Sequence, residues 1–141
     1  MRAFFQRFTR TPGRLLIVEP NPKEAQALLS LLQPQYRVEI AFTGKKALER
    51  LSVFQPEVVI TEIDLPDLSG VELIRTARAV PAQRQIIWIV TTQRNSIADK
   101  VASFQAGATD HLVKPIDLQA LPALLRNAYR LHQVAQKLVF S

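Results

Sequence analysis

The sequence contains no cysteine, which excludes both a disulfide framework and a thiolate metal site. Only 4 of its 141 residues are glycine, and neither a glycine-rich phosphate loop nor a serine or cysteine nucleophile motif occurs. No apolar run approaches the ~18 residues of a membrane span, and the start lacks the apolar segment of a secretory signal. These absences predict a cytoplasmic protein that is not an enzyme, and a length of 141 residues predicts a single domain.

Acidic residues are missing from both ends of the chain, although the net charge is only +6. The first 14 residues hold four arginines, the last 22 hold two arginines and a lysine, and the middle is nearly neutral. Basic ends can attract nucleic acid or an anionic membrane surface, and Phe4, Phe5 and Phe8 could give the first of them an apolar face. A solvated arm is the simpler interpretation, so residues 1–13 are expected to form a basic, Phe-containing N-terminal arm.

Apolar runs alternate with amphipathic segments five times along the chain. The expected strands are 14–19, 36–41, 58–62, 85–90 and 111–113. Five strand-then-helix units predict a parallel sheet covered by helices on both faces, with right-handed crossovers. Because a closed barrel needs eight such units, a three-layer doubly wound α/β domain is the expected fold class.

Capping residues mark where the intervening helices begin. The expected N-caps are Asn21, Thr43, Ser69, Asn95 or Ser96, and Asp117. In the fourth helix we expect Ile97, Val101 and Phe104 to face inward, with Gly107 as its C-cap.

Polar side chains follow the apolar runs at the carboxyl ends of four expected strands: Glu19, Glu62, Thr91 and Lys114. In an open parallel sheet these ends share one edge, where α/β proteins place their chemistry. Two acids, a hydroxyl and an ammonium should therefore meet in one crevice. The central stretch is 56–70, in which a buried strand stops at Glu62 and an acidic loop follows.

This cluster resembles the response-regulator receiver domain, in a degenerate, pseudo-receiver form. The motifs that carry the resemblance are Leu-Leu-Ile-Val-acid at 15–19, Leu-Pro-Asp-x-x-Gly at 65–70, Ala-Gly-Ala at 106–108 and the pair Lys114–Pro115. The resemblance covers residues 14–128 and leaves 129–141 as a C-terminal helical extension. It implies a flavodoxin-like sheet of order 2-1-3-4-5 and a cis bond before Pro115.

In that family, an aspartate on the third strand takes a phosphoryl group from a histidine kinase. Two acids after the first strand help to hold Mg²⁺, and a hydroxyl and a lysine bind the phosphoryl oxygens. By resemblance, Thr91 and Lys114 match the last two positions. The acceptor position holds Glu62, the first acid is Glu19, and Pro20 replaces the second acid.

Two further positions bear on the site. His111 occupies the aromatic switch position of the family, and Asp64 lies in the loop beyond Glu62, where it could contribute to a displaced cation site. For Asp64 and its neighbour Asp67, a solvated loop acid is the simpler interpretation. The two histidines of the chain have no metal-ligand spacing, so no metal site is expected from them.

The departures at the acceptor and metal positions have a predictable effect. Glutamate carries its carboxylate about 1.5 Å further than aspartate, and a 1 Å misplacement can cost in-line transfer on the order of 100-fold. Mg²⁺ demands near-ideal octahedral geometry, so with Pro20 in place of an acid its binding should be weak or absent. We therefore expect no cofactor and no phosphorylation of Glu62. Glu62 could imitate the phosphorylated state by reaching Lys114 and Thr91, or it could form only an ion pair that neutralises a buried lysine.

The last helix is expected to run from Asp117 to Leu138, roughly 33 Å at 1.5 Å per residue, with Pro122 delaying or kinking its start. Its apolar residues follow heptad spacing: Leu121, Leu124, Ala128, Leu131, Ala135 and Leu138. The first half should pack on the domain and the second half should project. A projecting amphipathic end suggests a homodimer or a link to an output domain.

Two main functions stay open. The first is a phosphorylation-independent signalling module that contacts a protein partner or fused output domain through its last strand, its last two helices and the helical extension. The second is an adaptor that binds nucleic acid or an anionic membrane through its basic termini, and a conventional phosphorylated receiver is a third. We favour the first, because nothing resembles a helix-turn-helix or a base-stacking platform.

Overall fold

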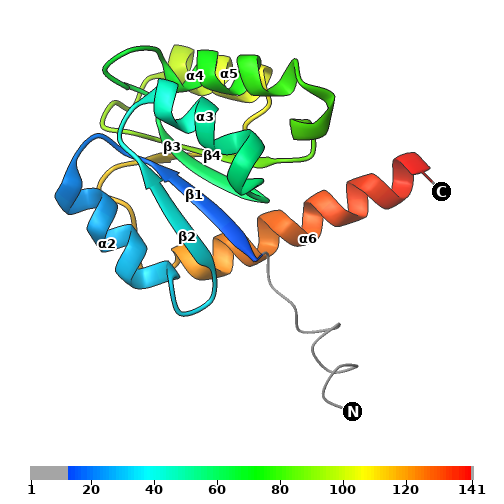
Figure 1. The fold of residues 1–141 in the computed structure, drawn as a ribbon, viewed down its shortest axis with the longest axis horizontal. Helices are drawn as coiled ribbons and strands as arrows, with labels where there is room; N and C mark the ends of the chain where they lie inside the picture. The colour runs from blue at the N-terminus through cyan, green and yellow to red at the C-terminus, as the bar shows by residue number, and fades with distance from the viewer. Residues whose placement is uncertain (1–12, 141) are drawn as a thin grey trace.

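The computed structural model describes residues 13–140, which form a domain built on one five-stranded parallel sheet (Figure 1). The strands are β1 (Arg14–Val18), β2 (Arg37–Ala41), β3 (Val58–Glu62), β4 (Ile87–Thr92) and β5 (Asp110–Val113). The helices are α2 (Pro22–Leu32), α3 (Gly44–Phe54), α4 (Gly70–Arg78), the 3₁₀ helix η1 (Pro81–Gln83), α5 (Ile97–Ala106) and α6 (Leu121–Phe140). The strand order is β2-β1-β3-β4-β5, which confirms the expected doubly wound α/β class.

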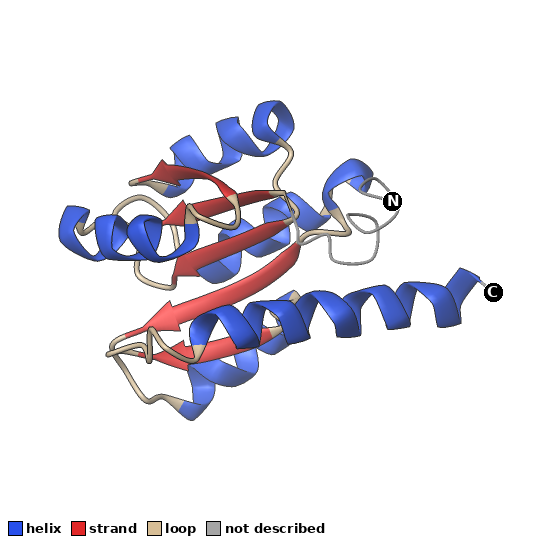
Figure 2. Ribbon diagram, turned by 90° about the horizontal axis from the view of Figure 1, so that it is seen from below, coloured by secondary structure: helices blue, strands red, loops and turns tan. Residues whose placement is uncertain are grey.

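Helices cover both faces of the sheet, with α3, α4 and α5 on one face and α2 and α6 on the other (Figures 1 and 2). Alternate strand residues supply the two cores, as the two-residue period of a strand requires. In β1, Leu16 and Val18 belong to the core beneath α3 and α4, whereas Leu15 and Ile17 belong to the core beneath α2 and α6. Every residue of β3 and β4 is buried, and β2 forms one edge as expected.

The observed boundaries of the helices and strands agree with most of the predicted ones. Side chains of the predicted N-caps accept backbone N–H groups at the starts of four helices: Asn21, Thr43, Ser69 and Ser96. Gly107 ends α5 with a φ of 122°, a conformation that L side chains rarely adopt. Strand β4 begins two residues later than expected. It also ends two residues later, because Thr91 and Thr92 continue the pairing with β5. β-Branched threonines fit a strand well.

The orientation predicted for α5 is wrong. Ile97, Val101 and Phe104 are 80%, 47% and 42% exposed, and the buried positions of the helix are Ser103 and Ala106. Small residues let α5 lie close to its neighbours, and Ser103 donates a hydrogen bond to the carbonyl of its own preceding turn, which satisfies its hydroxyl. The larger apolar side chains therefore form an outward stripe.

Helix α6 begins at Leu121, after the expected start at Asp117, which agrees with the delay expected from Pro122. Asp117 instead caps a turn, accepting hydrogen bonds from the amides of Gln119 and Ala120, and Pro122 lies in the first turn of the helix, where proline is tolerated. The first half of α6 packs on the sheet, and the second half extends past the sheet edge (Figure 2). None of the helices among the described residues is long and apolar enough to cross a membrane.

Candidate functional site

The predicted crevice lies at the carboxyl edge of the sheet. Glu62 is the last residue of β3, Thr91 lies on β4 directly opposite it, and Glu19 and Lys114 follow β1 and β5. Glu19, Glu62 and Thr91 are 4%, 6% and 2% exposed. The structure thus brings together all four side chains that the strand ends predicted.

The ammonium of Lys114 is shared by three carboxylates. Its Nζ lies 2.6 Å from Oε1 of Glu19, 2.9 Å from Oε1 of Glu24 and 3.1 Å from Oε2 of Glu62. The Thr91 hydroxyl donates a 3.1 Å hydrogen bond to the same Oε2 of Glu62. Lys114 donates a hydrogen bond to Glu19 and forms ion pairs with Glu24 and Glu62, so carboxylates surround its ammonium.

Burial and sharing move the pKa values of this cluster in a consistent way. Burial alone would lower the pKa of Lys114, but hydrogen bonds to Glu19, Glu24 and Glu62 outweigh it and raise the pKa above its ordinary value. Burial raises the pKa of Glu62, and the hydrogen bonds from Lys114 and Thr91 only partly offset this. One cation divided among three carboxylates explains both directions, because no single carboxylate receives the full attraction.

Backbone features fix the acids in place. The Asn21 amide donates a 3.0 Å hydrogen bond to Oε2 of Glu19, so each oxygen of this carboxylate has a partner. Gly70 allows α4 to begin against the end of β3, since a Cβ there would lie 2.7 Å from the Glu62 carbonyl oxygen. The Lys114–Pro115 peptide bond is cis, the isomer that the resemblance implies.

Glu24 belongs to the site and was not predicted. It lies in the first turn of α2, three residues after the N-cap Asn21, which is the spacing of a capping box. In the structure its carboxylate binds Lys114. Its role could have been predicted from its position, because Glu24 lies one turn after Pro20 on the helix that begins at the crevice.

The loop acids have structural partners. Asp64, predicted as part of the acidic pocket, pairs instead with Arg94, which also binds Asp99 of α5 at 2.8 Å. Asp67 is exposed, as expected for a solvated loop acid, and it also accepts hydrogen bonds of 2.9 and 2.8 Å from the amides of Gly44 and Lys45. These backbone bonds lower the pKa of Asp67. The loop after β3 is thus tied to α3 and α5.

His111, at the predicted switch position, points into the protein. Its side chain is 8% exposed, and its Nε2 atom has no hydrogen-bond partner. Burial lowers its pKa, and the positive charge of Lys100 adds to the effect. His111 is therefore a neutral, buried side chain near neutral pH.

The donor set does not fit Mg²⁺. Pro20 supplies no side-chain oxygen, and one oxygen from each of Glu19 and Glu62 is already bound to Lys114. Among residues 13–140, no group of three or more histidine, aspartate or glutamate side chains is arranged to hold a metal ion. An octahedral hydrated cation would have to displace the ammonium. The expected weakness of Mg²⁺ binding stays a prediction.

Comparison with known proteins identifies the family. The family model for the response regulator receiver domain matches residues 15–126, and the chain therefore belongs to this family of signalling domains. It is 36% identical over 119 residues to the transcriptional regulatory protein YkoG of Bacillus subtilis, an alignment that covers 84% of this chain and 51% of YkoG. The chain thus spans about half the length of this relative.

Solved structures agree with the family and the fold. A crystal structure from Chloroflexus aurantiacus, named for a response regulator, shares 31% identity, with a TM-score of 0.78 and coverage of 84% of this chain and 98% of that one. The receiver domain of the sensor histidine kinase PA1611 from Pseudomonas aeruginosa shares 26% identity, with a TM-score of 0.75 and coverage of 83% and 97%. The PA1611 structure is named for a magnesium ion coordinated in its active-site cleft.

Proposed function

We propose that this receiver domain is a pseudo-receiver, a signalling module that works by protein–protein contact without being phosphorylated. The observation that carries the proposal is the Lys114 ammonium bound by Glu19, Glu24 and Glu62, with Thr91 also bound to Glu62. Thr91 and Lys114 are the positions that, by family resemblance, bind the phosphoryl oxygens. Here the protein's own carboxylate uses both of them.

Electrostatics adds a second obstacle to phosphorylation. An incoming phosphodonor is an anion, and the crevice already holds three carboxylates against one ammonium. Phosphoryl transfer depends on positioning and on cations that neutralise the developing charge. The PA1611 cleft coordinates magnesium, whereas in this chain Pro20 has taken the place of an acid. Without a bound divalent cation, the charge balance opposes transfer to Glu62.

Glu62 also fits the role of a built-in substitute for the phosphorylated group. Its Oε2 atom contacts both the Thr91 hydroxyl and the Lys114 ammonium, which holds the ends of β3, β4 and β5 in one arrangement. A plain ion pair would require only the contact with Lys114. The additional Thr91 bond favours the interpretation that Glu62 fixes one output conformation.

The proposed contact surface comprises β5, α5 and α6. It exposes the apolar stripe of α5, namely Ile97, Val101 and Phe104, and also Val113 of β5. The occupant is a protein partner, a second copy or a fused output domain. Curated relatives such as YkoG, of which the alignment covers 51%, leave room for an output domain in the same polypeptide.

Phosphorylation itself tests the proposal. Wild-type protein is incubated with Mg²⁺ and a small-molecule phosphodonor and weighed intact by mass spectrometry. The matched positive control is the triple variant Glu19→Asp/Pro20→Asp/Glu62→Asp, which restores aspartates at the family positions. We expect no adduct on the wild type and a phosphoryl adduct on the triple variant. An adduct on Glu62 of the wild type would overturn the proposal.

A further inference from the structure

The second half of α6 carries an exposed apolar row. Leu131, Val134 and Leu138 are 57%, 48% and 78% exposed, on the part of the helix that extends past the sheet edge (Figure 2). Steps of three and four residues place them along one line of the helix surface, as the core positions of a coiled coil are placed. A seam this narrow is the contact face for one other helix.

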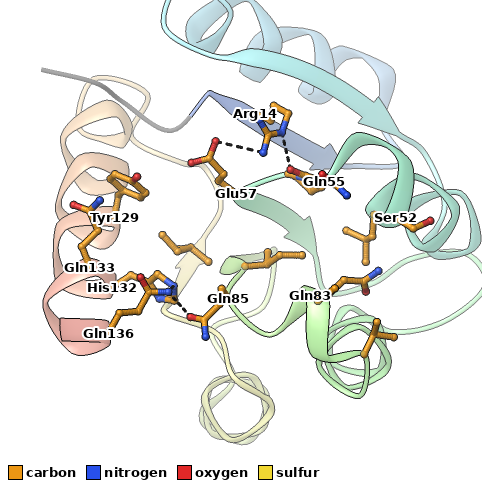
Figure 3. A pocket seen from close by; sticks show the side chains of 16 residues that line it. Arg14, Ser52, Gln55, Glu57, Gln83, Gln85, Tyr129, His132, Gln133 and Gln136 are labelled. Atoms are coloured by element: carbon orange, nitrogen blue, oxygen red, sulfur yellow. Dashed lines mark hydrogen bonds and ion pairs between the residues drawn. The ribbon is translucent and has the colours of Figure 1, made fainter. Parts of the chain in front are cut away.

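Contacts on the other side of α6 fix the direction in which this row points. Tyr129, His132 and Gln136 line a groove at the amino edge of the sheet, and Gln136 donates a hydrogen bond to Gln85 in the loop before β4 (Figure 3). Val134 lies two residues from both His132 and Gln136, and a two-residue step turns an α-helix by about 200°. The apolar row therefore faces away from the domain.

Basic side chains flank the row along one side. Arg130 precedes Val134 by four residues and Lys137 follows it by three, so both adjoin it on the helix surface, and both are exposed. Arg126, one turn before Arg130, is exposed on the same side. Among residues 13–140, no ion pair with a carboxylate involves Arg126 or Arg130. The helix itself contains no acidic residue, so this flank presents only positive charge.

We infer that this face docks an amphipathic helix of a partner protein, whose own apolar row is flanked by glutamate or aspartate. Charges beside the seam decide which helices pair, and carboxylates opposite Arg126 and Arg130 supply the missing opposite charge. A second copy of α6 would bring more cations and no acid. A helix that lies on a membrane needs a broader apolar face, whereas this row ends at cations on one side and at the small Ala135 on the other. This partner rests on the proposed function, in which the domain acts by protein contact, and specifies the partner chemistry left open there.

Two synthetic helical peptides test the inference with the full chain. Each is about three heptads long, with leucine at both core positions, and carries either glutamate or lysine at the flanking positions. Binding is measured by fluorescence anisotropy of the labelled peptides. We expect the glutamate peptide to bind and the lysine peptide to bind about tenfold more weakly, because opposite charges are replaced by like charges at several positions.

Charge reversal separates this face from general electrostatic attraction. Arg126→Glu/Arg130→Glu should reverse the preference between the two peptides. The matched control is Lys23→Glu/Arg75→Glu, which makes the same change in net charge at exposed positions of α2 and α4 and should leave the preference unchanged. Leu131→Ala/Leu138→Ala should weaken binding of the glutamate peptide while circular dichroism stays unchanged. Equal affinity for both peptides, or a preference that survives the Arg126→Glu/Arg130→Glu reversal, would overturn the inference.

Two further measurements examine other occupants of the face. Binding to vesicles of an anionic phospholipid that is lost in Leu131→Ala/Leu138→Ala would assign the face to a membrane. Self-association in analytical ultracentrifugation that the same variant abolishes would assign it to a second copy, and either result overturns the inference. The peptide assay contains neither Mg²⁺ nor a phosphodonor, so its failure leaves the phosphorylation test unaffected. An adduct on Glu62 in that test would likewise leave the peptide result standing.

Discussion

Lys114 is the residue on which the candidate site depends. Burying an ammonium is costly unless its donors are satisfied, and here three carboxylates satisfy them. The reverse also holds, because three buried or half-buried carboxylates without a cation would repel one another. The cluster is therefore a mutually dependent unit, in which removing the single cation should cost more than removing any one acid.

Replacing Lys114 with methionine should destabilise the domain by about 3–5 kcal/mol, the cost of leaving buried charges uncompensated. Urea unfolding followed by circular dichroism measures the change. The matched control is Lys23→Met at an exposed position of α2, which should stay within about 0.5 kcal/mol of wild type. A Lys114→Met protein as stable as this control would show that the cluster contributes nothing.

The raised pKa of Glu62 predicts a pH dependence. The folded protein holds the Glu62 proton to a higher pH than the unfolded chain, for which the ordinary value is 4.5. Stability contributed by this group is therefore lost as the pH rises from 4.5 through the folded pKa. The free energy of unfolding of wild type relative to Glu62→Gln should fall over that interval. Carbon-13 NMR of the Glu62 carboxyl gives its pKa directly, and a value at or below 4.5 contradicts the assignment.

Glu62→Gln also tests whether the charge sets the output state. The glutamine keeps the shape of the side chain and can still accept the Thr91 hydrogen bond, but it loses the ion pair with Lys114. We expect an unchanged fold by circular dichroism and altered amide chemical shifts in β5 and α5, the proposed contact surface. Shift changes limited to the immediate neighbours of residue 62 would reduce Glu62 to a structural ion pair.

Helix α6 has two halves that differ in burial. Leu125 is 1% exposed and packs against the sheet, whereas Leu131, less than two turns later, is 57% exposed. Leu125→Ala should cost about 2–5 kcal/mol through the cavity it leaves. Leu131→Ala should change stability by no more than about 0.5 kcal/mol. Equal losses in urea unfolding would show that the second half is packed as tightly as the first.

The stripe on α5 should matter for binding and not for folding. Ile97→Ser alters an 80% exposed side chain, so we expect a change in unfolding free energy within about 0.5 kcal/mol. Self-association, measured by analytical ultracentrifugation, should weaken if a second copy is the partner. Ala106→Leu is the matched core change, and overpacking there should cost about 1–3 kcal/mol.

The sequence predicted the elements well where local signals and burial agree. Caps such as Asn21 and Ser69 mark the helix starts correctly, because their side chains satisfy amides whatever the tertiary context. The buried face of α5 was predicted wrongly. The spacing of large apolar residues does not reveal that the helix packs through its small residues, Ser103 and Ala106. Glu24 was missed for a related reason: a capping-box position explains a glutamate locally, while its actual partner, Lys114, is distant in sequence.

The two edges of the sheet differ in the side chains that they carry. The carboxyl edge holds the acidic cluster around Lys114, and the amino edge holds a groove of about 560 Å³ lined by residues of α6 and η1 (Figure 3). The basic, Phe-containing arm lies outside the described residues, so the adaptor function stays a prediction. Salt distinguishes the adaptor from a module that works by protein–protein contact. Binding to DNA should fall steeply with ionic strength, whereas apolar contact through α5 should not.

Titration of the wild-type protein with Mg²⁺, followed by NMR at the amides of Glu19 and Glu62 and at the ammonium of Lys114, shows whether this cluster can hold a metal ion. We expect no saturable shift at millimolar Mg²⁺ and an unchanged Lys114 ammonium signal, because that ammonium already occupies the carboxylates. Saturable shifts of all three groups, with release of Lys114, would show a working metal site and overturn the proposed pseudo-receiver.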